Sequence, residues 1–223
     1  MNQEQALSLL KETKLVAILR GIPVKQATDI ATALYDGGVR VLEFTFDHDD
    51  PDCVAHNCQR IRAVKKIFGD EMVVGCGTAL TVQEVEASVE AGGQIVISQN
   101  VDVSVIAKTK ALGAISMPGA LTPTEIVMAY NAGADIVKLF PAGTLGVPYI
   151  KAVRGPLGYI PMSAVGGVRP ETIADFLNVG VCGFGVGGEL VKKEFVRSGD
   201  MNALTSRARK FVHAIEQWEA NRS

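Results

Sequence analysis

The chain has 223 residues, of which 48% are hydrophobic and 21% charged, which is enough apolar material for one sizeable core. Its formal net charge of -2 gives no electrostatic basis for binding nucleic acid or an anionic membrane surface. No uninterrupted apolar run approaches the length that spans a membrane, so a transmembrane protein is excluded as well.

The cysteines and the first residues bear on the cellular compartment. Residues 1–4 lack the basic region and the long apolar run of a secretory signal. The cysteines have no spacing typical of zinc or redox motifs, which predicts reduced thiols in the cytoplasm; they are Cys53, Cys58, Cys76 and Cys182. No linker-like or low-complexity stretch interrupts the chain, so we predict a single domain over residues 1–223.

Apolar periodicity predicts a short N-terminal helix over residues 3–13, followed by a regular alternation of strands and helices. Short apolar runs predict eight strands, at 15–19, 39–44, 72–76, 94–98, 114–117, 135–140, 160–164 and 181–186. Amphipathic segments predict eight helices, at 23–35, 51–68, 81–91, 102–112, 123–132, 147–154, 170–179 and 202–219. Capping-box patterns begin two of these helices, from Thr81 to Glu84 and from Thr122 to Glu125.

This alternation determines the fold class. Short strands separated by single helices pair in parallel through helical crossovers. Eight such units predict an α/β protein that is a single (β/α)8 TIM barrel, with the short helix in front of it. An open doubly wound sheet is the alternative, although no dinucleotide-binding fingerprint follows the first strand.

A lysine stands in the middle of the apolar sixth strand. Side chains alternate along a strand, so Lys138 shares a face with Ile136 and Phe140. Both faces are otherwise apolar, and a buried ammonium is unfavourable unless it is paired, neutral or functional. One alternative is that the stem of Lys138 lies along apolar surface while its head reaches water.

A glutamate interrupts the second strand in the same way. Glu43 shares a face with Val41 and Thr45, and it would point into the barrel together with Lys138 if that face is interior. Active sites of such barrels lie at the carboxyl ends of the strands. The pair is either a structural ion pair or a nucleophilic amine with a carboxylate that transfers protons.

Glycine pairs follow the last two strands, where barrels of this kind often bind phosphate. Gly166 and Gly167 follow the seventh strand, and Gly187 and Gly188 follow the eighth. The run at 183–188 resembles a dinucleotide loop only faintly, since no further strand–helix–strand unit follows it.

No metal site is predicted. The histidines do not cluster with metal-ligand spacing. The acidic run at 47–50 could bind a cation, but such a run is more often a solvated loop and helix start.

At this point the motifs identify a resemblance that covers nearly the whole chain. The chain resembles the class I aldolases that cleave 2-keto-3-deoxy-6-phosphogluconate, its galactonate epimer or 4-hydroxy-2-oxoglutarate. The motifs are AILRG (17–21), VLEFT (41–45), GCGT (75–78), MPG (117–119), TPTE (122–125), VKLFP (137–141) and AVGGV (164–168). The lysine motif in order with the glutamate motif is the most specific part.

The resemblance implies a mechanism and a set of site residues. The lysine matching Lys138 forms a Schiff base with the keto acid, and the glutamate matching Glu43 moves protons. Arg20 and Thr78 are assigned to the substrate carboxylate. The rest of the substrate, including its phosphate, is assigned to Thr45, Pro118, Phe140, Gly166, Gly167, Gly187 and Gly188. The family is typically a trimer of barrels, which implies a homotrimer.

The chain departs from the family pattern at several positions. Asp47 stands where many relatives have arginine, although other relatives instead carry the arginine that matches Arg20. Gly188 replaces a serine that contributes to phosphate binding in relatives, and Gln99 replaces a frequent proline. The AVGGV motif looks more like the galactonate enzyme than the gluconate one, so the choice of substrate stays open.

These observations lead to one hypothesis and its rivals. We expect a metal-independent lyase that splits a 2-keto-3-deoxy-6-phospho sugar acid into pyruvate and glyceraldehyde 3-phosphate. The protonated imine is the electron sink, so no external cofactor is needed. The alternatives are a 4-hydroxy-2-oxoglutarate aldolase giving pyruvate and glyoxylate, a phosphate-binding barrel of different chemistry such as an isomerase or thiamin-phosphate-type synthase, and a non-catalytic sugar-acid sensor.

Overall fold

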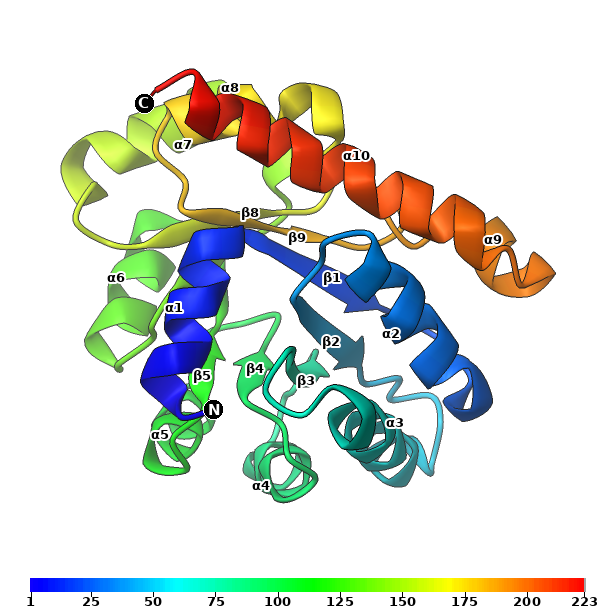
Figure 1. Cartoon of the computed structure of the whole chain (residues 1–223). Coiled ribbons are helices and arrows are strands. Elements are labelled where there is room, and N and C mark those ends of the chain that lie inside the picture. Colours follow the sequence, from blue (N-terminus) through cyan, green and yellow to red (C-terminus); the bar gives the residue numbers. More distant parts are fainter. Residues whose placement is uncertain (223) are drawn as a thin grey trace.

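Parallel strands form one sheet that curves around the centre of the molecule (Figure 1). The computed structural model describes residues 1–222. The order across the sheet is β5-β4-β3-β2-β1-β9-β8-β7-β6, and all of its strand pairs are parallel. The strands are β1 (Leu15–Leu19), β2 (Val41–Thr45), β3 (Val73–Gly77), β4 (Ile95–Ile97), β5 (Ile115–Met117), β6 (Gly119–Ala120), β7 (Val137–Leu139), β8 (Met162–Val165) and β9 (Gly183–Val186).

The two ends of this strand order meet at Pro118, which separates β5 from β6. Proline has no N–H for a strand ladder, and a separate short segment, β6, begins after it. The predicted strand at 114–117 corresponds to β5, and β6 lies beyond the predicted range. The Pro118 carbonyl still accepts a hydrogen bond of 2.9 Å from the backbone N–H of Lys138 in β7. The predicted TIM barrel is confirmed, with nine strand segments in place of eight strands.

Helices surround the ring of strands on the outside (Figure 1). Both predicted capping boxes are present, at the starts of α4 and α6. The helices are α1 (Gln3–Thr13), α2 (Ala27–Asp36), α3 (Cys53–Phe68), α4 (Val82–Glu90), α5 (Val103–Ala111), α6 (Pro123–Asn131), α7 (Ala142–Leu157), α8 (Ile173–Asn178), α9 (Lys193–Ser198) and α10 (Met201–Ala220). None of the helices in residues 1–222 combines the length and hydropathy needed to cross a membrane.

Some helix limits differ from the predictions. Short 3₁₀ turns, Val24–Gln26 and Pro170–Thr172, precede α2 and α8, because each segment begins beside a proline that fixes the first turn. Helix α7 begins at Ala142, five residues before the predicted start, and Gly146 interrupts it with a φ of 75°. The short helix α9 was not predicted.

The core has two parts. The larger part lies between the sheet and the outer helices, and the smaller part fills the barrel with apolar side chains that point inward. Ala6 and Leu10 of α1 pack against the inner side chains Val16, Val41 and Val73. The N-terminal helix therefore closes one end of the barrel and leaves the carboxyl ends of the strands free for a site.

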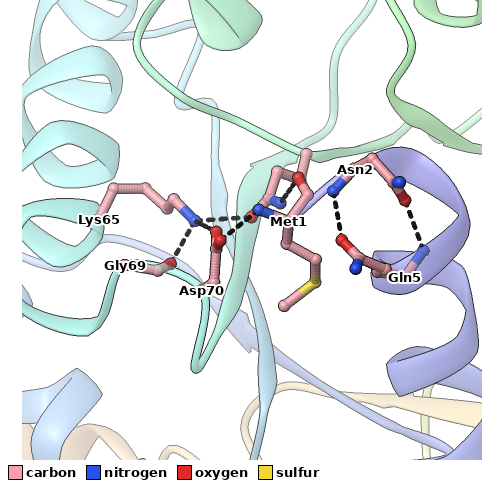
Figure 2. Close-up of polar contacts among 7 residues, drawn as sticks. Met1, Asn2, Gln5, Lys65, Gly69 and Asp70 are labelled. Atoms are coloured by element: carbon pink, nitrogen blue, oxygen red, sulfur yellow. Dashed lines mark hydrogen bonds and ion pairs between the residues drawn. The ribbon is translucent and has the colours of Figure 1, made fainter.

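Polar contacts fix the start of α1 to the barrel (Figure 2). Asn2 and Gln5 form a capping box, with a bond of 2.9 Å in each direction. The N-terminal ammonium of Met1 pairs with Asp70, which also lies 3.8 Å from Lys65 Nζ. These contacts hold α1 across the amino ends of the strands, opposite the end that carries the polar site.

Candidate active site

A cavity of about 440 Å³ opens at the carboxyl ends of the strands. Most of the strands contribute to it, because parallel strands in a barrel all end on the same face. Its lining combines a few charged side chains with glycine-rich loops and is formed by Ile18, Arg20, Glu43, Thr78, Gln99, Lys138, Phe140, Val165, Gly166, Gly167, Val168, Gly185, Val186, Gly187, Gly188 and Glu189.

Lys138 is the central residue of β7 and is only 3% exposed. Backbone pairing places it between Gly119 of β6 and Ser163 of β8, so the strand ladder fixes its Cα on both sides. Its Nζ donates a hydrogen bond to Oε1 of Gln99 and lies 5.3 Å from the centroid of the Phe140 ring. The amine is therefore held at the cavity wall with little contact with bulk water.

Glu43 lies in the middle of β2 and is 2% exposed. Its Oε2 has no hydrogen-bond partner among residues 1–222. A Cβ at Gly77, in the neighbouring strand β3, would lie 1.2 Å from this oxygen, so a side chain there would displace the carboxylate from this position. An unpartnered buried carboxylate oxygen is unfavourable in a resting protein, and such a group is available to a reacting molecule.

Burial favours the neutral form of both residues, so it shifts their pKa values in opposite directions. It raises the pKa of Glu43 to about 7, although the positive charges of Lys138 and Arg20 oppose the rise. It lowers the pKa of Lys138 to about 8, with Glu43 opposing the change and Arg20 adding to it. With these pKa values a fraction of Lys138 is present as the neutral amine near neutral pH, next to a carboxyl group that can give or take a proton.

The alternative of a structural ion pair is not supported. The salt bridges among residues 1–222 include none between Lys138 and Glu43. Nζ of Lys138 instead donates a hydrogen bond to Gln99, and Oε2 of Glu43 has no hydrogen-bond partner among the described residues. A pair that existed to satisfy two buried charges would be expected to make that direct contact.

Arg20 and Thr78 supply hydrogen-bond donors to the same cavity. The exposed side chain of Arg20 lies between this cavity and a second one of about 400 Å³, which Asp47 also lines. Thr78 has a φ of 56°, a left-handed conformation that a β-branched residue rarely adopts. Strained backbone of this kind persists mainly at functional sites, and a guanidinium with a hydroxyl can hold a carboxylate.

The glycine loops form the far side of the cavity. Gly166 and Gly167 have φ values of 88° and 73°, which side chains rarely tolerate, and the Phe140 ring lies against Gly166. The N–H of Gly143, at the start of α7, donates a bond of 2.7 Å to the Gly166 carbonyl. Around Gly188 no heavy atom lies within 4 Å of the position a Cβ would take, so this part of the loop has open space.

The structure therefore brings together all of the predicted site residues except two. Thr45 is buried at the end of β2 with an unpartnered Oγ1, and it does not line the cavity. Pro118 lies in the barrel wall, where its carbonyl holds the backbone of Lys138. These two positions stay outside the lining of this cavity.

The acidic loop after β2 is engaged in ordinary side-chain pairs. His48 Nε2 lies 2.8 Å from Glu84 Oε1, and His56 Nδ1 lies 2.7 Å from Asp50 Oδ2. Within residues 1–222, no three His, Cys, Asp or Glu side chains are grouped as metal ligands. The structure therefore gives no positive support to the alternative of a cation site at 47–50.

The comparison with known proteins agrees with this site. The family model for KDPG and KHG aldolase matches residues 7–207. The chain belongs to this aldolase family. The probable 2-dehydro-3-deoxy-6-phosphogalactonate aldolase of Rhizobium meliloti (strain 1021) is 36% identical over 81% of this chain and 83% of its own length. The KHG/KDPG aldolase of Escherichia coli (strain K12) is 32% identical over 95% of this chain and 96% of its own.

A solved structure leads to the same family. The native KDPGal structure is 32% identical, covers 92% of this chain and 96% of its own, and has a TM-score of 0.83. The resemblance found in the sequence motifs is thus confirmed, and with it the prediction of an aldolase, a carbon–carbon lyase. The alternative that this chain belongs to a phosphate-binding barrel family of different chemistry, such as the isomerases, is therefore excluded.

Two residues of this aldolase site were not assigned roles from the sequence. Gln99 was noted only as a departure from the family pattern, yet it is the hydrogen-bond partner of Lys138. Gly77 was noted only as part of a motif, yet it makes room for Glu43. In the β2–β3 register Gly77 is paired with Thr45, two residues beyond Glu43, so its closeness to the Glu43 carboxylate depends on the direction of that side chain and has no signal in the sequence.

Proposed function

We propose that the chain cleaves a 2-keto-3-deoxy-6-phospho sugar acid into pyruvate and glyceraldehyde 3-phosphate. The observation that carries this proposal is the buried Lys138 amine, with its lowered pKa, in one cavity with the partly protonated Glu43 carboxyl. Trapping of the imine with pyruvate and borohydride tests it directly. The galactonate epimer is the favoured substrate, because relatives 36% and 34% identical carry that name.

The proposed reaction begins with attack of the neutral Lys138 amine on the C2 carbonyl carbon. A new C–N bond forms, the carbonyl oxygen takes a proton, and loss of water gives a protonated imine. Glu43 then removes the proton of the C4 hydroxyl, the C3–C4 bond breaks, and its electron pair moves into the imine as an enamine. The aldehyde leaves, C3 takes a proton back, and hydrolysis releases pyruvate and restores the amine.

Arg20 is proposed to bind the carboxylate of the keto acid, and we expect Arg20→Ala to weaken pyruvate binding. Losing a charge-assisted contact weakens binding by about 1.5–3 kcal/mol, or roughly tenfold to a hundredfold in Kd. Arg197→Ala is the matched control, since Arg197 lines the second cavity but not the main one. Titration with pyruvate measures both variants, and an unchanged Kd in Arg20→Ala would return Arg20 to a structural role.

The glycine loops are proposed to face the phosphate, and we expect a preference for phosphorylated substrate that Gly188→Ser increases. The space around Gly188 accommodates the added side chain, and a hydroxyl can donate to a phosphate oxygen. The gain should be about tenfold in relative kcat/KM. Gly188→Ala fills the same space without a donor and should not produce it.

The same assay distinguishes the main alternative substrate. Equal kcat/KM values for phosphorylated and unphosphorylated keto acids would favour 4-hydroxy-2-oxoglutarate, which yields glyoxylate. The KHG/KDPG relative, 32% identical, makes this the second candidate.

One carboxylate, that of Glu189, also lines the far end of the cavity. It lies 3.3 Å from the guanidinium of Arg207, so its negative charge opposes phosphate binding only in part.

We further propose that the enzyme is a cytoplasmic homotrimer built from one domain over residues 1–223. Exposed apolar side chains near α6 support an interface between copies; these are Leu121, Met128, Tyr130 and Tyr159. The rings of Tyr130 and Tyr159 lie 5.7 Å apart, edge to face, and both are exposed. The unpaired cysteines are consistent with a reducing compartment. Light scattering that gives the mass of one chain would contradict the trimer.

A further inference from the structure

Gln99 follows strand β4 and reaches into the cavity beside the reactive lysine. Its Oε1 accepts a hydrogen bond from Nζ of Lys138, and the side chain lines the cavity wall. A lysine nitrogen in its ammonium form has only donors to offer, so the glutamine must present its oxygen. This contact joins the loop after β4 to the middle of β7, two strands that lie on different sides of the β5–β6 junction.

The backbone around Gln99 is held on both sides. A Cβ on Gly119 would lie 2.4 Å from the Gln99 carbonyl oxygen, so the bare glycine of β6 allows this close approach. Ser98, one residue earlier, donates from its N–H to the Met117 carbonyl and from its Oγ to the Asn100 carbonyl, at 3.4 Å and 2.9 Å. The backbone of Gln99 is thereby held by the barrel, and its half-buried carboxamide is oriented by the bond to Lys138.

The charge of the group beside Lys138 matters for its chemistry. Glu43 and Arg20 already act on the amine with opposite signs, and Glu189 lines the far part of the cavity. A second carboxylate in place of Gln99 would favour the ammonium form, which cannot attack a carbonyl. A carboxamide oxygen accepts the N–H without adding a negative charge.

We propose that Gln99 is a positioning residue that holds one N–H of Lys138 throughout Schiff-base formation. The ammonium, the amine, the carbinolamine and the protonated imine each keep at least one hydrogen on this nitrogen. A bond from that hydrogen to Gln99 Oε1 leaves the lone pair of the amine free for the keto carbon. In the protonated imine the same bond becomes charge-assisted and stabilises the electron sink for cleavage. This inference rests on the proposed Schiff-base function.

Two variants test the inference by different readouts. Gln99→Met keeps the length of the side chain and removes the strong acceptor, and we expect kcat to fall about tenfold or more. The rate of imine trapping with pyruvate and cyanoborohydride should fall with it, while thermal unfolding stays near that of the wild type. Gln99→Glu keeps the acceptor and adds a negative charge that favours the ammonium form. The pH at which the trapping rate increases should therefore be higher than in the wild type, by about one pH unit or more.

Asn100 offers the matched controls, because it is the next residue and its side chain is exposed. Asn100→Met and Asn100→Asp make the same chemical changes without touching Lys138, and both should keep the wild-type rate and pH profile. Two results would overturn the inference: wild-type trapping and turnover in Gln99→Met, or a pH profile of Gln99→Glu that moves no further than that of Asn100→Asp. Failure of the proposed function itself looks different, since the wild type would then trap no pyruvate.

Discussion

We expect the Lys138→Arg variant to lose carbon–carbon cleavage and imine trapping together, while the protein stays folded. The guanidinium keeps the positive charge but stays protonated at all working pH values, so it cannot become the neutral nucleophile. Removing a covalent nucleophile typically lowers turnover by on the order of 10⁶-fold. A coupled assay for pyruvate release measures the loss, and circular dichroism with thermal unfolding checks the fold.

Two further variants make the Lys138 result specific. Lys138→Met removes the charge and the amine without the bulk of arginine, and it should be equally inactive. Lys192→Arg makes the conservative change at a lysine with 41% of its side chain exposed and should leave turnover unchanged. If cleavage survives in Lys138→Arg and disappears with a chelator, the enzyme is a metal-dependent aldolase and the Schiff-base mechanism is wrong.

The Glu43→Gln variant should keep pyruvate binding and lose turnover by about 10²–10⁴-fold, the usual contribution of a general acid–base group. Glutamine has nearly the same shape, so it fits the space that Gly77 leaves and removes only the ability to exchange protons. Glu84→Gln is a control at another buried carboxyl group, which pairs with His48 outside the cavity. Wild-type turnover in Glu43→Gln would remove the proton-transfer role.

The same variant should also change the pH dependence of trapping. The Glu43 carboxylate favours the ammonium form of Lys138 and so opposes the lowering of its pKa to about 8. Without that negative charge the pKa of Lys138 falls further, and the free amine is available at lower pH. Trapping by Glu43→Gln should therefore extend to more acidic solutions than trapping by the wild type, even though cleavage is slow. An upward shift would contradict this electrostatic coupling.

Much of the barrel could be predicted because each strand is short, apolar and separated from the next by one amphipathic helix. The short strand β6 could not, since it follows Pro118 and lies beyond the apolar run that marks the fifth strand. Helix α9 has one turn and a half of mixed charged and apolar residues, too short for helical periodicity to emerge.

The central pair of the site was predictable for a different reason. Lys138 and Glu43 are charged residues inside otherwise apolar strands, and that contrast is visible in the sequence alone. Gln99 is polar at the end of a strand, where polarity is ordinary, and its partner lies 39 residues away. Only the ring of strands brings the two side chains together, so the contact could not be inferred from spacing.

Two predicted site positions, Thr45 and Pro118, lie outside the lining of the cavity. Thr45 and Pro118 belong to motifs shared with the aldolases, but one is buried at a strand end and the other supports the Lys138 backbone through its carbonyl. A motif marks residues that a fold requires as well as residues that touch substrate.

The most direct test of the central claim is reduction of the wild-type enzyme with borohydride in the presence of pyruvate, followed by intact-mass measurement and peptide mapping. We predict one reduced pyruvyl group per chain, attached to Nζ of Lys138, with no modification of half-buried or exposed lysines such as Lys65 and Lys192. Absence of any adduct in active enzyme, or an adduct on another lysine with Lys138 unmodified, would contradict the assignment of Lys138 as the Schiff-base nucleophile.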